Sequence, residues 1–243
     1  MNLILRSNTL FIIPCSGKKK STGKTLDEYD DPLRKLVSPE TYRKILPSRE
    51  YILRNIQKYS SNKQSKNKNI KLGPDFGSKD LSGKYLPAID RYNGYLYTAK
   101  ENFSDIIKNG LDNPDKPRII ILSALYGPLH PLSMIQDYEL KMSDKYACKT
   151  WKEHFPDFLS DYTQHNNIKR IHLYLGSSTD YYKIAKKAIQ PLLKKGSINQ
   201  AVQFEVEKGN SYHTPANHGH LVTAHLQNKS VSRLTRKITV NYF

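Results

Sequence analysis

The sequence predicts an α/β fold, and three apolar runs carry most of that prediction. Residues 10–14, 118–122 and 170–175 are short, largely apolar stretches typical of buried strands. Each of them leads directly into a loop of small or polar residues. Apolar side chains recur at helical spacing over residues 48–59 and 181–193, which predicts two helices. Because the loops that follow parallel strands meet at one edge of a sheet, we expect a functional site at that edge.

Turn and capping signals place the remaining elements. The Ser-Pro-Glu tripeptide at residues 38–40 predicts a helix start. The Asn-Gly pair at residues 93–94 predicts a hairpin or a tight turn ahead of a helix over residues 99–108. Residues 201–206 read as a further strand. Lysines recur among Ser, Asn and Gln after residue 60, which predicts an exposed basic loop near residues 60–75.

The composition fits one folded domain. The chain has 243 residues, of which 37% are apolar, and its 17 Tyr and 7 Phe supply a large buriable area despite a mean hydropathy of -0.66. This argues against a wholly disordered chain. With no internal repeat and no sharp boundary, residues 1–243 are expected to form a single compact domain.

The charge is strongly positive and has two interpretations. The 39 Lys and Arg outnumber the 22 Asp and Glu, which gives a formal net charge of +17 and a pI near 9.7. Such a surface attracts polyanions, and nucleic acid is the commonest polyanion in a cytoplasm. The alternative is codon bias, since the chain is rich in Lys, Asn, Ile and Tyr, as an AT-rich genome would encode.

Targeting and cysteine signals favour a cytoplasmic protein. No apolar stretch approaches the roughly 18 residues of a membrane span, so no membrane partner is expected. The first apolar residues are interrupted by Arg6-Ser7-Asn8, and Pro14 precedes Cys15, so a signal or lipoprotein peptide is not expected. Cys15 and Cys148 are too few for a disulfide framework or a cysteine-based zinc site. No cofactor is expected.

The loop after the first strand is a candidate phosphate site. Residues 17–25 resemble the P-loop pattern but hold five residues between the glycines where the pattern has four, so a P-loop is not expected. Phosphate binding without hydrolysis is the remaining role, because small and basic residues after a strand can bind phosphate through backbone N–H groups and charge. The candidates are Ser16, Gly17, Lys18 and Lys20. The alternative is a solvated basic turn.

Cysteine and histidine give two further candidates. Cys15, at a strand end beside three lysines, is a candidate nucleophile or redox sensor, with a small packed residue as the alternative. A C-terminal histidine cluster has spacings that fit no familiar metal signature, so no metal is expected there and a loop that contacts phosphate or solvent is favoured. Its members are His213, His218, His220 and His225.

The most informative run spans residues 121–142. A strand leads into a tight Tyr-Gly-Pro turn, and a proline-punctuated loop then carries Asp137 and Tyr138 back toward the same edge. In the alternative interpretation, Tyr126 and Leu129 only fasten this loop to the core.

This run resembles the L-S-[GA]-L-Y-G-x-L-x-P-L segment of the YaaA-like family of peroxide-stress proteins, and its continuation resembles that family's Y-x-L-x-M segment. Residues 92–98 and 175–183 are similar to two further segments of the family, in the same order. The resemblance implies a mixed central sheet flanked by helices, a basic cleft, DNA binding and protection of DNA from oxidative damage. Related small proteins also open with a Cys-x-x-[KR] loop.

The chain departs from the family pattern in two places. The helix-hairpin-helix segment that binds DNA in the family would fall between residues 33 and 59, where no hairpin glycine is found. The basic C-terminal segment of the family is replaced by the histidine-rich stretch.

Two functions follow from these observations. In the first, a YaaA-like protein binds DNA or another phosphate-bearing ligand through Lys18, Lys19, Lys20 and the lysines of the 60–71 loop. In the second, an enzyme of glycosidase or transferase type acts on a nucleotide or nucleobase in a closed pocket.

The enzyme hypothesis assigns roles to particular residues, and the sequence sets no oligomeric state. Asp137, Tyr126, Tyr97 and Cys15 are the candidate catalytic residues. The residues expected to contact the ligand, in addition to the loop named above, are Ser123, Gly127, Ser177 and Tyr181.

Overall fold

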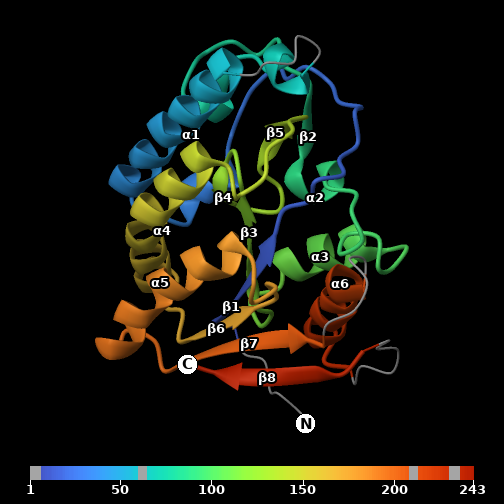
Figure 1. Cartoon of the computed structure of the whole chain (residues 1–243), viewed down its shortest axis with the longest axis vertical. Coiled ribbons are helices and arrows are strands. Elements are labelled where there is room, and N and C mark those ends of the chain that lie inside the picture. Colours follow the sequence, from blue (N-terminus) through green and yellow to red (C-terminus); the bar gives the residue numbers. More distant parts are fainter. Residues whose placement is uncertain (1–6, 60–64, 208–212, 230–235) are drawn as a thin grey trace.

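The computed structural model describes residues 7–59, 65–207, 213–229 and 236–243. Within them a six-stranded mixed sheet runs in the order β4-β3-β1-β6-β7-β8 (Figure 1). Its four central strands are parallel and are β3 (Arg118–Ser123), β1 (Thr9–Pro14), β6 (Arg170–Leu173) and β7 (Gln200–Val206). The edge strands β4 (Gly127–Leu129) and β8 (Ile238–Tyr242) are antiparallel to their neighbours. The predicted α/β class with a mixed central sheet is confirmed.

β1 is central because its side chains are apolar on both faces. Leu10 to Ile13 are fully buried, as expected for a parallel strand covered by helices on both sides. Phe11 pairs with Ile119 of β3 on one side and with His172 of β6 on the other. The chain therefore leaves β1 in one direction to reach β3 and later returns to its other side, which places a topological switch point at the end of β1.

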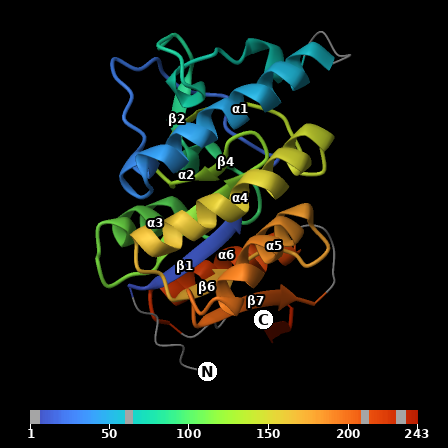
Figure 2. The same ribbon diagram turned by 90° about the vertical axis from the view of Figure 1, so that its left-hand side faces the viewer.

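Helices cover both faces of the sheet. Figures 1 and 2 show α1 (Pro39–Tyr59), α4 (Lys145–His165) and α5 (Asp180–Lys194) stacked over one face. The other face carries α3 (Phe103–Leu111) and α6 (His213–Leu226). The short helix α2 (Ala88–Arg91) follows β2 (Tyr85–Pro87), which pairs with β5 (Met134–Gln136) in a small second sheet. Short 3-10 helices span Pro32–Lys35, Lys66–Asn69 and Pro74–Phe76.

Most predicted elements are confirmed, with shifted boundaries. The expected helix at 48–59 is the second half of α1, which begins at the predicted start and continues through Pro47. The Asn-Gly pair forms a tight turn, and the helix after it starts at Phe103, four residues later than expected. The segment in which the family would place a helix-hairpin-helix is largely one continuous helix, α1.

Two predictions of exposed loops are wrong in part. The histidine-rich stretch is not a loop, because residues 213–226 form α6 and pack against β7. In the predicted basic loop near 60–75, residues 60–64 lie outside the described residues. From residue 65 onward Asn67, Ile70 and Asp75 are buried, whereas the lysines are exposed. Asn67 fixes the segment by donating from Nδ2 to the Glu139 carbonyl at 2.7 Å.

Candidate functional site

The site lies where β1, β3 and β6 end. The Cys15 amide donates to the Leu122 carbonyl at 2.9 Å, and the Tyr174 amide donates to the Ile12 carbonyl at 3.0 Å. These bonds extend the strand pairing by one residue past each strand. They bring the loop of residues 15–20 against residues that follow β3 and β6, as the sequence analysis expected.

Cys15 faces the first turn of α5. The Thr179 hydroxyl caps that helix by accepting from the Tyr182 amide at 3.3 Å, which fixes where the helix starts. Tyr181 then lies with its hydroxyl oxygen 3.0 Å from the Cys15 sulfur. Both side chains are half-buried. Burial raises the pKa of the Tyr181 hydroxyl well above its ordinary value, so it keeps its proton and can donate to the sulfur.

Lys19 is the lysine of the loop that turns inward. A backbone bridge to Tyr92 holds it, and its ammonium nitrogen lies 3.9 Å from the centre of the Tyr138 ring. Burial lowers the pKa of this ammonium, while Cys15 and Asp137 oppose the shift. Lys18 and Lys20, by contrast, are exposed. The basic loop therefore has one partly buried cation beside the thiol and two cations in solvent.

A chain of buried hydroxyls lies under Lys19. The Tyr92 and Tyr138 hydroxyl oxygens are 3.0 Å apart, and Tyr138 is 2.8 Å from the Ser123 hydroxyl. Ser123 in turn accepts from the Tyr126 amide at 3.0 Å. Burial raises the pKa of both tyrosines well above the ordinary value, so both remain neutral. This network fixes the aromatic ring on which the Lys19 ammonium lies.

A cavity of about 390 Å³ opens beside Cys15. One wall is the end of β1 and the loop after it, and the opposite wall is the tight turn at residues 93–98, with Pro215 of α6 at its rim. Tyr97 joins the two walls, because its hydroxyl donates to the Pro14 carbonyl at 2.8 Å. The lining residues from the sequence prediction are Cys15, Ser16, Gly17, Lys18 and Tyr97.

Comparison with known protein families gives a match over almost the whole chain. Residues 10–235 match the family described as peroxide stress protein YaaA. The chain belongs to the YaaA family. No curated protein matches it significantly. The resemblance inferred from the residues is thus confirmed.

Two residues from the run shared with the YaaA family have structural roles and do not line the cavity. Tyr126 is fully buried, and its hydroxyl donates to Asp75 at 2.9 Å. Gly127 has φ +64, and a Cβ there would lie 2.3 Å from the Trp151 ring. Neither residue lines the cavity, which argues against the roles expected for them. The alternative interpretation, that this loop is fastened to the core, describes Tyr126 better.

Three other candidates also lie away from the cavity lining. Ser123 is fully buried and supports Tyr138. Ser177 donates to Glu205, in a separate hollow formed with Asn241 near the end of β8. Asp137 is mostly buried beside the site and pairs with Lys66 at 3.1 Å. The structure therefore does not bring Ser177 together with Ser16 and Lys18.

Two histidines of the C-terminal cluster contact residues of the core. His218 lies 2.7 Å from the Phe204 carbonyl through Nε2, and His225 lies 2.7 Å from the Tyr174 hydroxyl through Nδ1. In the described part of the chain, no group of His, Cys, Asp or Glu is arranged to hold a metal ion. None of the helices in the described ranges combines the length and apolarity that a bilayer span requires.

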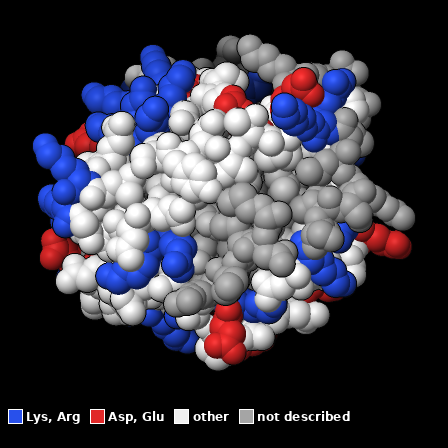
Figure 3. Space-filling view, turned by 90° about the horizontal axis from the view of Figure 1, so that it is seen from below, with Lys and Arg blue, Asp and Glu red and all other residues white. Residues whose placement is uncertain are grey.

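Surface charge is dispersed on the face that Figure 3 shows. Lys and Arg form separate groups there, with Asp and Glu between them. The described lysines of the predicted basic loop are Lys66, Lys68 and Lys71, and Lys66 pairs with Asp137. Lys63 lies outside the described residues.

Tyr92 and Tyr138 were not predicted as site residues, and Lys19 was predicted only as one of the lysines that contact phosphate. Lys19 was one of three adjacent lysines, and only the bridge to Tyr92 distinguishes it. Tyr92 and Tyr138 were the outer residues of two segments that resemble the family. Their proximity to one another depends on the tertiary fold, and no local signal could have shown it.

Proposed function

We propose that this YaaA-family protein binds a phosphate-bearing ligand of nucleotide size in the cavity beside Cys15. Membership of the family is consistent with a role in peroxide stress. The carrying observation is the cavity of about 390 Å³, which falls in the size range of small-molecule sites and is lined by the basic loop after β1.

The chemistry of the walls supports this ligand class. Lys18 supplies a cation at the rim, and the Ser16 hydroxyl, which accepts from the Lys18 amide at 3.2 Å, supplies a polar group. Tyr95 and Tyr97 supply aromatic surface on the opposite wall, against which a base can pack. The same loop can contact the phosphate of a DNA strand end, so DNA is a second source of this chemistry.

Binding of a nucleotide panel and of duplex and single-stranded DNA at two salt concentrations tests the proposal. Fluorescence anisotropy with unlabelled competitors is suitable. We expect an unlabelled nucleotide to displace the labelled probe. Lys18→Ala should weaken nucleotide binding at least about tenfold, the usual effect of losing a charged contact. Lys195→Ala, an exposed lysine at the far end of α5, is the matched control.

The outcomes separate the ligand sources. The loop would be assigned to DNA phosphate if DNA binding weakens steeply with salt and nucleotides do not displace the DNA. In that case Lys18→Ala should bind DNA as weakly as it binds nucleotide. If Lys18→Ala binds every ligand as tightly as the wild type, the proposed site is wrong.

An enzyme acting on a nucleotide or nucleobase is the second candidate. The observation in its favour is the Cys15 thiol, which lines the cavity 3.0 Å from the Tyr181 hydroxyl with Lys19 nearby. Chromatography of nucleosides and nucleotides after incubation with the protein tests for turnover. Loss of turnover in Cys15→Ser and in Asp137→Asn would support the predicted catalytic roles, and no turnover in the wild type would remove this candidate.

A further inference from the structure

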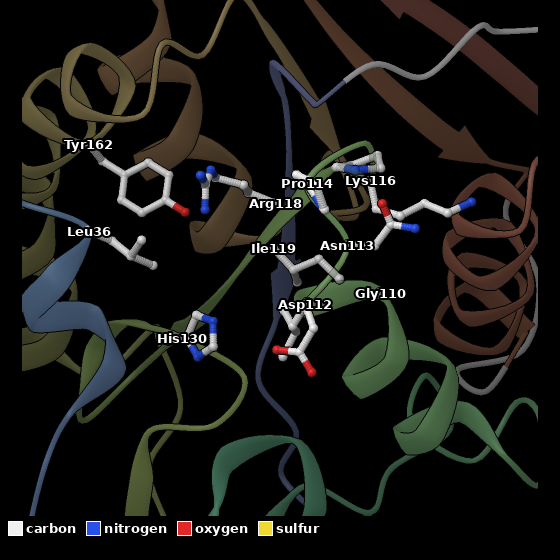
Figure 4. Close-up of a pocket in the computed structure, with 12 residues that line it drawn as sticks. Leu36, Gly110, Asp112, Asn113, Pro114, Lys116, Arg118, Ile119, His130 and Tyr162 are labelled. Carbon is white, nitrogen blue, oxygen red and sulfur yellow. The ribbon is translucent and has the colours of Figure 1, made fainter.

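A second cavity lies at the opposite edge of the sheet, where β3 begins. It has a volume of about 240 Å³ and is formed by the end of α3, the start of β3, and side chains from α4 and from the loop after β4 (Figure 4). Arg118 starts β3 here, whereas Ser123 ends the strand at the Cys15 site. Five residues of strand separate the two positions, roughly 17 Å.

Tyr162 of α4 places a hydroxyl in this cavity. The residue is fully buried, and its hydroxyl has no hydrogen-bond partner among the described residues. Burial raises the pKa of Tyr162 above its ordinary range, so the group keeps its proton and remains a donor. A buried donor without an acceptor is costly, and such groups in native proteins commonly serve a ligand or an ordered water.

Arg118 supplies a cation next to that hydroxyl. Figure 4 shows its guanidinium directed toward the Tyr162 hydroxyl. Arg118 also acts electrostatically on both Tyr162 and His130. No side-chain ion pair within the described residues neutralises this guanidinium, so its five donors are available.

His130 provides a third donor. Its Nδ1 accepts from the Leu132 amide at 3.2 Å, so in the neutral ring the proton is on Nε2. Burial lowers the pKa of His130 to about 4, which keeps the ring neutral at physiological pH. Leu36 and Ile119 add apolar surface to the cavity. The carboxylate of Asp112 lies on another side and is directed away from Arg118 in Figure 4.

We propose that this cavity binds the oxyanion group of a small metabolite, held by the Arg118 guanidinium, the Tyr162 hydroxyl and the His130 Nε2–H. Three donors from different elements line this one small cavity and match the several acceptor oxygens of a phosphate or carboxylate. The apolar side chains contact the organic part of the ligand. Nothing in this inference depends on the function proposed for the Cys15 cavity.

Thermal unfolding in inorganic phosphate or acetate, against chloride at matched ionic strength, tests the inference. We expect one of the two oxyanions to raise the unfolding temperature of the wild type more than chloride does, and the better of them identifies the oxyanion class. Tyr162→Phe should weaken that apparent affinity about fivefold and Arg118→Gln at least about tenfold.

Tyr29→Phe is the matched control, because the Tyr29 hydroxyl is also buried without a partner among the described residues but lies outside this cavity. In chloride, both Phe variants should unfold at the wild-type temperature or higher. With the oxyanion, only Tyr162→Phe should lose stabilisation.

Three results would overturn the inference. The first is equal stabilisation of the wild type by oxyanion and chloride. The second is a Tyr162→Phe response that equals the wild-type response. The third is an oxyanion effect that disappears in Lys18→Ala and persists in Tyr162→Phe, which would place the anion at the Cys15 cavity and leave the proposed function standing.

Discussion

His172 shows how a polar side chain can become part of an apolar core. It lies fully buried on β6, and its ring stacks on Phe11 with centroids 5.4 Å apart. The edge of Phe204 approaches from the other side, and neither ring nitrogen has a hydrogen-bond partner among the described residues. Burial, with a smaller effect of His225, lowers the pKa of His172 to about 3. The ring is therefore neutral in the folded protein.

Replacing His172 by Phe should reduce the dependence of the free energy of unfolding on pH in the acid range. Between pH 4 and 6 the unfolded chain binds a proton at this residue and the folded chain does not, so stability is lost as pH falls below about 6.5. The variant should lose this contribution to the free energy of unfolding, which amounts to about 1.4 kcal/mol per pH unit. At pH 7 the two proteins should differ by less than about 1.5 kcal/mol.

Urea denaturation of both proteins across this pH range measures the effect. His165→Gln, at an exposed position, controls for the loss of a histidine as such. A His172→Phe profile parallel to that of the wild type would show that His172 contributes no pH dependence.

At the scale of elements, the turn between β3 and β4 fixes how α4 packs. Gly127 adopts φ +64, in the left-handed region that favours glycine. Trp151 of α4 covers it, and the Trp151 indole N–H donates to the Ala124 carbonyl at 2.9 Å. This contact joins the turn to a helix of 21 residues that also packs against α1 and α5. The proximity of Trp151 explains the glycine better than contact with a ligand does.

Gly127→Ala should destabilise the protein by about 2–4 kcal/mol, because it combines backbone strain with overpacking against the indole. Gly17→Ala is the matched control, since a Cβ at Gly17 would have nothing within 4 Å. Chemical denaturation should show Gly17→Ala within about 1 kcal/mol of the wild type. Equal stability of the two variants would contradict this account of the turn.

At the scale of the whole molecule, Arg49 joins three separate parts of the chain. From α1 its fully buried guanidinium donates to the carbonyls of Tyr126 at 2.8 Å, Pro128 at 3.1 Å and Asp75 at 3.2 Å. Asp31 supplies the counter-charge at 3.6 Å. These contacts connect the helical layer to the edge of the main sheet and to the 3-10 helix at Pro74–Phe76.

Arg49→Met should cost about 3–5 kcal/mol, since it leaves Asp31 as an uncompensated buried charge and frees three buried carbonyls. Arg54→Met is the control on the same helix, because Arg54 pairs with Glu50 at the surface. That exposed pair should contribute less than about 1 kcal/mol. Comparable losses in the two variants, measured by urea denaturation, would refute the structural role of Arg49.

The parts that local sequence determines are the strands and the half of the site that lies on one loop. β1 and β3 are largely apolar because they are buried on both faces, and this burial is visible in the sequence itself. The loop after β1 follows directly from β1, so Cys15, Ser16, Gly17 and Lys18 lie together, and they line one cavity.

Only the tertiary structure decided which residues from distant segments meet. Lys19 lies against Tyr138, 119 positions later, whereas Ser177, which was also predicted as a site residue, donates to Glu205 in a separate hollow. Helix α4 was not predicted, although its buried residues Trp151, Phe155 and Tyr162 recur at helical spacing. The buried Arg49 network carried no motif signal. Such pairings depend on side-chain direction and long-range packing, which residue type and spacing along the chain do not encode locally.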